Sequence, residues 1–268
     1  MKIRTLAQST FGSFFHNWVV LILLIVCVGV VLLMMTPLLG AKAMTSAQNA
    51  AQMQTVVLSM VSGIMTFVSA FGSVVAAWAA ADALATEMTS GTILAVMARP
   101  VKRWEFLVGK FLGVMLLMAA YAVMMFGLSW LLAWIGGERI QSTPWVLLVY
   151  PMVRYAIWAA AAMALATLLR PMITMGIVVL LQIGAFLIGR ADLEAERVAT
   201  RYMLHGLYWV LPSTNLLSES RFLEITHASL KQTGWLEHVT TLAYGLDYAV
   251  VCLVLAMWSF HYRSLKRD

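Results

Sequence analysis

The sequence predicts an all-α integral membrane protein with six transmembrane helices, an N-terminal interfacial helix and a short cytoplasmic helix. Of its 268 residues, 62% are hydrophobic and only 11% are charged, whereas soluble domains are nearer half apolar and a quarter charged. Six apolar stretches each approach the ~20 residues that a spanning helix needs. Cys27 and Cys252 both lie inside such stretches, so we expect no disulfide framework.

The first 17 residues have the pattern of an amphipathic helix lying in the membrane interface. Apolar side chains recur at helical spacing, and Lys2, Arg4 and uncharged polar residues fall between them. The alternative is a signal peptide cleaved near Ala43. However, the apolar run from Trp18 to Met35 has 18 residues, which is longer than the roughly 7–15 residues of a signal core. The length favours a membrane span.

The six predicted spans are distributed over one transmembrane domain, 1–268. Apolar runs of this length favour helices, because a membrane barrel shows alternating segments of ~10 residues instead. The spans are 18–39, 55–81, 107–135, 145–169, 172–189 and 241–260.

The distribution of basic residues predicts the orientation of these spans. With the N-terminus in the cytoplasm, ten Lys and Arg residues lie in cytoplasmic segments and seven in external ones. Five of those seven are in the long segment 190–240, where the positive-inside rule is weakest. We therefore expect both termini and the loop 82–106 in the cytoplasm, and 190–240 outside.

The loop 82–106 contains a short apolar segment with helical start and stop signals. A polar stretch from Thr89 to Thr92 precedes it, and Ser or Thr side chains cap the first free N–H groups of a helix. Arg99 precedes Pro100, and the residue before a proline is disfavoured in the α region. The alternative is a plain solvated loop, in which positive charge is expected anyway.

No enzyme site is predicted. The chain lacks a GxxxxGK[ST] phosphate-binding loop. Its five histidines are scattered without a paired His or Cys at metal-ligand spacing. We therefore expect no metal and no cofactor in this chain. The sequence pI of about 9.5 reflects basic residues at the membrane surface and indicates no nucleic-acid partner.

Two ionisable residues lie at similar depth inside predicted spans, Arg154 in the fourth and Asp247 in the sixth. Intramembrane charges are costly and usually pair or face a cavity, so we expect a contact between them or a shared polar cavity. The alternative is that each side chain snorkels to the outer surface. Gly109 and Gly113 form a GxxxG pattern that favours close helix packing.

The stretch from Asp82 to Lys110 resembles the signature of ABC-2 type transporter permeases, the membrane subunits of type-2 ABC exporters. The branch containing the nitrous-oxide-reductase maturation permease also carries an acid at the position of Asp82. The predicted interfacial helix, six spans and external segment are similar to the family's architecture. The other matching positions are Glu87, Gly91, Thr92, 93–98, Arg99, Pro100, Arg103, Gly109 and Lys110.

The resemblance implies a permease that forms a translocation pathway as a homodimer or with a related permease, in a bacterial-type cytoplasmic membrane. It implies separate cytoplasmic ATPase subunits that bind ATP and Mg²⁺ and seat the helix 91–98 as a coupling helix. Membrane lipids are further expected partners, and an external accessory protein at 190–240 is a possible one. The implied coupling residues are Glu87, Gly91, Thr92, Ile93, Leu94, Met97, Arg99, Pro100 and Arg103.

Two alternatives of other classes stay open at this point. One is a membrane anchor or assembly subunit that moves no substrate. The other is an ion-driven secondary transporter that uses Arg154 and Asp247. The sequence shows no internal repeat and few intramembrane charges, which disfavours the ion-driven alternative.

Overall fold

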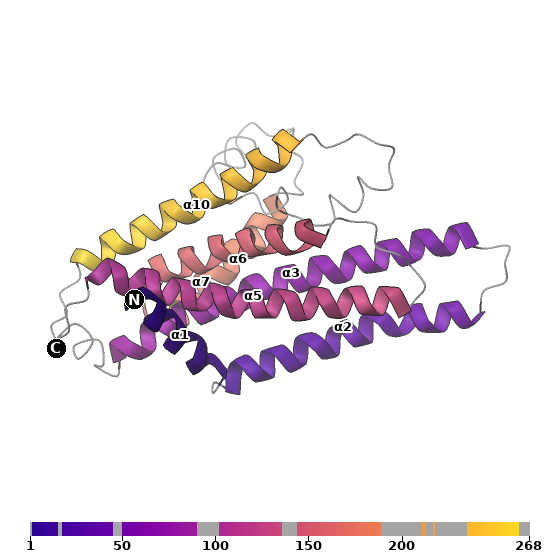
Figure 1. Cartoon of the computed structure of the whole chain (residues 1–268), viewed down its shortest axis with the longest axis horizontal. Helices are drawn as coiled ribbons and strands as arrows, with labels where there is room; N and C mark the ends of the chain where they lie inside the picture. Colours follow the sequence, from indigo (N-terminus) through magenta and orange to yellow (C-terminus); the bar gives the residue numbers. More distant parts are fainter. Residues whose placement is uncertain are drawn as a thin grey trace.

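Helices form all the regular secondary structure that the computed structural model of the chain describes (Figure 1). The structure describes residues 2–15, 18–44, 50–89, 102–135, 144–188, 211–212, 217 and 235–262. Its helices are α1 (Lys2–Phe15), α2 (Trp18–Met44), α3 (Ala50–Thr89), α5 (Arg103–Ile135), α6 (Pro144–Ala166), α7 (Pro171–Ile188) and α10 (Trp235–Tyr262).

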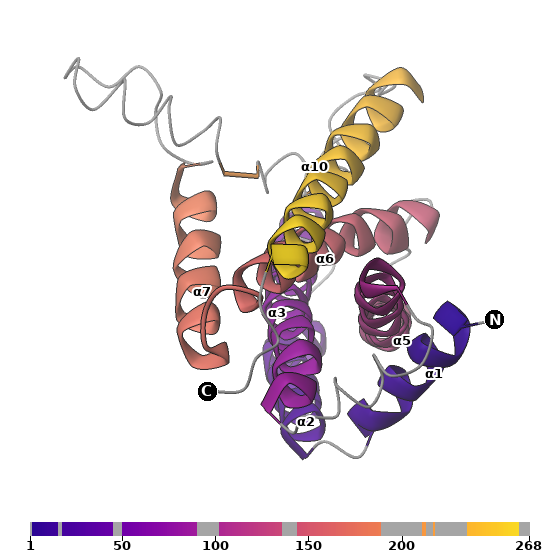
Figure 2. The ribbon, with the colours of Figure 1, turned by 90° about the vertical axis from the view of Figure 1, so that its left-hand side faces the viewer.

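The bundle is built around α3 and α6. α3 contacts α2, α5, α6 and α7, and α6 also contacts α10. α5 and α7 lie on opposite sides of α3, and α10 covers α6 on the side away from α2 (Figure 2). Alanines are buried in both central helices, at 76–77 and 79–81 of α3 and at 159, 160 and 162 of α6. Small side chains let helix backbones approach closely, which explains this packing.

Among the described residues, four helical segments are long and apolar enough to cross a membrane. They are Gly63–Thr86, Arg103–Leu128, Leu148–Ala166 and Leu236–Phe260. The first and fifth predicted spans are also helical, as α2 and α7, but the apolar stretches described in them, Leu21–Leu33 and Met172–Leu187, are shorter. The all-α membrane architecture therefore agrees with the prediction, and the number of six spans stays a prediction.

Several helix ends differ from the predicted boundaries, and three of them border the coupling loop or the external segment. α3 was predicted to end at Ala81 but continues to Thr89. α5 begins at Arg103 and α10 at Trp235, four and six residues before the predicted spans. The segment 82–89 contains no proline or glycine and is rich in Ala, Leu, Glu and Met, which are strong helix formers. Hydropathy marks where a membrane ends, whereas helix propensity carries the helix beyond that point.

The N-terminal helix α1 packs along α5. Thr10, which interrupts the apolar face of α1, is buried there, and its Oγ1 donates a 2.8 Å hydrogen bond to the carbonyl of Leu6. Gly113 of α5 faces this helix: a Cβ at Gly113 would lie 2.6 Å from Thr10 Cβ and 2.9 Å from the Ala7 carbonyl oxygen. Gly109 is buried one turn before it. The absence of a side chain at Gly113 lets α1 and α5 meet.

We expect Gly113→Leu to displace α1 from α5, because a leucine side chain has no room beside Thr10. In a background with both native cysteines replaced, Thr10→Cys should then react with a thiol reagent at least about fivefold faster, as an overpacking cost of about 1 kcal/mol allows. Gly127→Leu on the same helix is the matched control, since a Cβ there meets nothing within 4 Å. Equal labelling rates in both variants would contradict the packing role of Gly113.

Candidate functional site

The structure describes both ends of the predicted coupling loop. Glu87 lies in the last turn of α3 and Arg103 is the first residue of α5. α1 and the C-terminal end of α10 lie at the same end of the bundle (Figure 1). The other predicted coupling residues lie outside the described residues: Gly91, Thr92, Ile93, Leu94, Met97, Arg99 and Pro100.

The start of α5 is stabilised by a local cap. The backbone N–H of Lys102 donates to Glu105 Oε2 at 3.0 Å, and the N–H of Phe106 donates to the Lys102 carbonyl at 3.2 Å. Glu105 therefore supplies the acidic half of a capping box, three positions after the N-cap residue. Its negative charge also lies at the positive end of the helix dipole. The loop consequently leads into a well-defined helix start.

The same end of α5 is fastened to the end of α10. Arg103 Nη1 donates a 3.3 Å hydrogen bond to the carbonyl of Phe260, a residue 157 positions away. The rings of Phe106 and Phe260 are buried and stacked, with centroids 6.1 Å apart and planes at 18°. Carbonyls in the last turn of a helix lack helical partners, and cations are favourable there. Arg103, the first residue after the loop, thus connects α5 to α10.

A second connection joins α3 to α5. Thr86 Oγ1 donates to Asp82 Oδ1 at 3.4 Å, and the charge of Lys110 acts on Asp82. Lys110 is only 6% exposed, and its Nζ lies 5.9 Å from the centre of the Phe106 ring. The two end residues of the stretch that resembles the ABC-2 signature are therefore electrostatically connected across the two helices that flank the loop.

Arg154 and Asp247 do not share an environment. Arg154 is buried within α6, at 8% exposure, whereas Asp247 is exposed on α10. Gly245 and Ala249 are the residues of α10 that turn toward α6: both are buried, and a Cβ at Gly245 would overlap Val153 Cγ1. Asp247 is two residues from each and so projects about 200° away around the helix. The predicted contact is not found between these two described side chains.

A buried aromatic contact lies where α2, α3, α5 and α6 meet, and the sequence did not reveal it. Tyr121 donates its hydroxyl to the Val68 carbonyl at 2.9 Å and lies 3.3 Å from Cys27 Sγ. Its ring meets that of Tyr155 edge to face, with centroids 6.0 Å apart. Gly72 lies against both rings. The available signal was a tyrosine in the middle of an apolar span, since a buried tyrosine hydroxyl usually requires a partner.

Polar side chains also line the contact between α3 and α7. Ser73 Oγ donates to the Ala70 carbonyl at 2.7 Å and lies 3.4 Å from Gln182 Oε1. Within the described part of the chain, the buried Ser69 Oγ and Gln182 Nε2 have no hydrogen-bond partner. An unsatisfied buried polar atom is costly and calls for an explanation. We call Ser69, Ser73 and Gln182 the polar strip; only Gln182 stood out in the sequence, because it interrupts an apolar span.

No cluster of three or more His, Cys, Asp or Glu residues that could hold a metal occurs among the described residues. His238 belongs instead to a packing contact between α10 and α6. Its Nδ1 lies 2.8 Å from the Tyr150 hydroxyl, and the two rings meet edge to face at 6.1 Å.

Leu211 and Leu217 of the predicted external segment lie against the bundle. Leu217 is fully buried in a cluster with Tyr150, Val153 and Ala249 of α6 and α10. Leu211 is buried beside α7, where a Cβ at Gly184 would lie 3.7 Å from Leu211 Cδ1. The first residues of α10 belong to this segment too, since Trp235 precedes the predicted span by six residues.

A family model described as "ABC-2 family transporter protein" matches residues 5–265. No curated protein matches the chain. The matched residues run from α1 to just beyond α10, so they include every contact described above.

Proposed function

Because the chain belongs to the ABC-2 family of transporter proteins and is a membrane permease subunit of an ABC transporter, we propose that it is an exporter subunit that works as a dimer and is driven by separate cytoplasmic ATPases through residues 91–98. Permeases of this family are typically non-enzymatic, with the ATPase activity in another subunit. ATP and Mg²⁺ then bind to the ATPases and not to this chain.

The observation that carries the proposal is that both ends of the loop are connected to neighbouring helices of the bundle. Arg103 and Phe106 bind the start of α5 to the end of α10, and Asp82 is connected electrostatically to Lys110. A force applied between Thr89 and Lys102 therefore acts on α3, α5 and α10 together. Packed helices respond to such a force as rigid bodies, which suits a segment that receives ATP-driven motion from a partner.

The polar strip is the part of the bundle that we assign to the pathway. Ser73 and Gln182 belong to α3 and α7, and α3 is one of the helices that the loop would move. Hydrogen-bonding atoms in the interior of a membrane bundle favour a polar group or water over lipid. Movement of α3 relative to α7 would expose these atoms to a passing substrate.

The ion-driven alternative required Arg154 and Asp247 to act together. Their positions on α6 and α10 do not bring them together within one chain. We therefore favour ATP-driven transport.

We expect Gly91→Pro combined with Ile93→Asp to abolish co-purification with the ATPase encoded beside this chain. Proline at position 91 fixes the backbone φ, removes an N–H group and restricts the preceding residue to extended conformations, so it alters how the chain enters the helix. Aspartate removes an apolar contact that would seat the helix in its partner. The measurement is the stoichiometry of the complex in mild detergent, with gel filtration to establish that the permease remains folded. The matched control introduces the same two residue types at the same spacing between α2 and α3, as Ala47→Pro and Asn49→Asp.

Two outcomes would contradict the proposal. If the wild-type chain binds no ATPase in mild detergent, ATP-driven coupling is wrong. If the wild type binds but the double variant binds equally well, the docking residues lie elsewhere than 91–98.

A further inference from the structure

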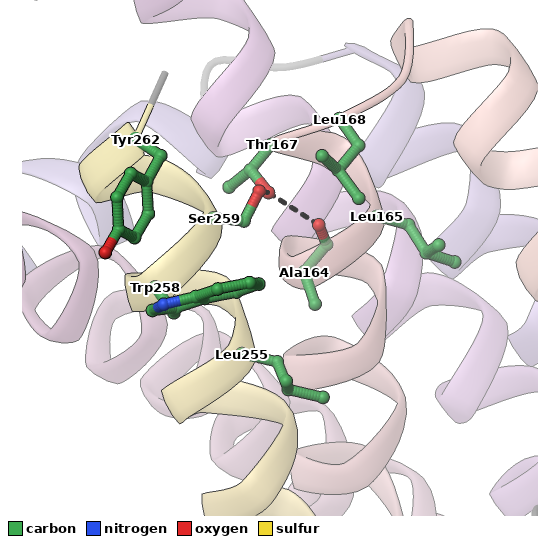
Figure 3. A pocket seen from close by; sticks show the side chains of 8 residues that line it. All are labelled: Ala164, Leu165, Thr167, Leu168, Leu255, Trp258, Ser259 and Tyr262. Carbon is green, nitrogen blue, oxygen red and sulfur yellow. Dashed lines mark hydrogen bonds between the residues drawn. The ribbon is translucent and has the colours of Figure 1, made fainter.

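An open groove lies between the last turns of α6 and α10 (Figure 3). It has a volume of about 780 Å³, within the roughly 300–1,000 Å³ of small-molecule sites. Leu165 of α6 and Leu168 of the turn that follows α6 line one side, and Leu255, Trp258 and Tyr262 line it from α10. The groove lies at the end of the bundle that holds the coupling loop, because Phe260 in the same turn of α10 is bound to Arg103.

The hydroxyl groups of Thr167 and Ser259 in the groove are hydrogen-bonded to each other. Thr167 Oγ1 lies 2.6 Å from the Ala164 carbonyl oxygen and 2.8 Å from Ser259 Oγ (Figure 3). These hydroxyls therefore hold α6 to α10 and leave a mainly apolar surface to an occupant. Such a surface suits a hydrocarbon chain better than a polar ligand.

Two aromatic residues mark the depth of the groove in the membrane. Trp258 is 64% exposed and Tyr262 is 73% exposed, and their rings meet edge to face with centroids 5.4 Å apart. Exposed Trp and Tyr side chains concentrate at the level of lipid headgroups. An occupant would therefore place a polar headgroup beside Tyr262 and its apolar part along Leu255.

The charges at this end of the bundle are mostly positive. Arg170 is exposed two residues after Leu168, and Arg103 lies at the end of α10. The sequence continues after Tyr262 with Arg263, Lys266 and Arg267. The nearby acid Glu105 is used to cap α5. Basic residues beside the cytoplasmic ends of membrane helices attract anionic lipid headgroups.

From this combination of an apolar groove, interfacial aromatic residues and basic charge, we propose that the groove binds an anionic phospholipid of the cytoplasmic leaflet. One acyl chain lies between Leu165 and Leu255, and the phosphate lies beside Arg170, which is exposed two residues after Leu168. A second copy of the chain or the ATPase would match the groove less well, because an apolar protein contact does not explain the positive charge around it. This site does not depend on which substrate the permease moves.

The test is photo-crosslinking in bilayers with equal amounts of phosphatidylglycerol and phosphatidylethanolamine, using the purified full-length permease. A photoreactive amino acid replaces Leu168 in the groove or Leu180 on α7, which has the same 68% exposure and lies outside the groove. Mass spectrometry then identifies the crosslinked lipids. At position 168 we expect phosphatidylglycerol to be enriched about fivefold over the bilayer ratio, as about one nearby cation provides. At position 180 we expect the bilayer ratio itself.

Two further variants separate charge from shape. Arg170→Gln should return the lipid ratio at position 168 to that of the bilayer, without changing the crosslinking yield at position 180. Ala164→Trp should fill the groove and lower the lipid yield at position 168 alone. Equal lipid ratios at both positions would mean ordinary surrounding lipid and would overturn the proposal. Crosslinks from position 168 to a second copy, or to the ATPase when it is added, would overturn it in favour of a protein interface.

Discussion

Gly72→Val is expected to lower the melting temperature of the purified permease by about 2–10 °C, because overpacking a closed interior costs roughly 1–3 kcal/mol. A Cβ at Gly72 would lie 2.6 Å from both Tyr121 Cε1 and the Tyr155 hydroxyl oxygen. Tyr121 cannot move away freely, since its hydroxyl is bound to the Val68 carbonyl. Valine would therefore force α3 away from α5 and α6.

The measurement is thermal unfolding followed by fluorescence-detected gel filtration in detergent. Gly63→Val is the matched control on the same helix, because a Cβ at Gly63 meets nothing within 4 Å. We also expect Gly72→Ala to be partly rescued by Tyr155→Leu, which removes two of the three close atoms. A melting temperature unchanged by Gly72→Val would show that α3 and α6 are not packed as described.

Arg154→Met should destabilise the permease by at least about 5 °C in melting temperature, whereas Asp247→Asn should have almost no effect. Arg154 is buried and engaged by neighbouring groups. Removing the charged member of a buried interaction leaves its partner unsatisfied, which typically costs about 3 kcal/mol. Asp247 is exposed on the face of α10 opposite Gly245, so its charge contributes little to the packing of the chain.

The charge exchange provides the decisive comparison. Arg154→Asp together with Asp247→Arg should be no more stable than Arg154→Asp alone, because the two side chains do not meet within the chain. Recovery of stability by the exchange would mean that Arg154 and Asp247 pair after all, for instance across two copies. Such a recovery would support the pairing of Arg154 with Asp247 that their similar depth in the membrane suggested.

The sequence predicted the helical architecture well because hydropathy and length determine it. The predicted starts of two spans, at 18 and 172, agree with the observed starts of α2 and α7 at Trp18 and Pro171. The ends of α3 and the start of α10 were predicted less well. At the end of α3 polar residues follow the apolar run, and at the start of α10 they precede it. Neither stretch contains a residue that breaks the helix.

The contacts of the candidate site were beyond sequence reasoning. Asp82 and Lys110 stood out because they are the first and last residues of the stretch that resembles the family signature. The hydrogen bond from Arg103 to Phe260 could not be predicted in this way, because it joins residues 157 positions apart. Such a contact depends on which helix ends lie side by side. The depth of Arg154 and Asp247 was accessible from counting residues, whereas their facing directions depend on which side of α10 packs on α6. Gly245 marks that side of α10, because it lies against Val153 of α6, a contact that is visible only in the structure.

The hydrogen bond between Arg103 and Phe260 also sets an order of events during biosynthesis. α5 leaves the ribosome long before α10, and early domains and helices generally form first during synthesis. This end of the bundle nevertheless stays incomplete until α10 is in the membrane. A chain shortened before Trp235 would lack the carbonyl that Arg103 binds and the ring that stacks on Phe106. α10 thus supplies the partners that Arg103 and Phe106 of α5 lack until it is in place.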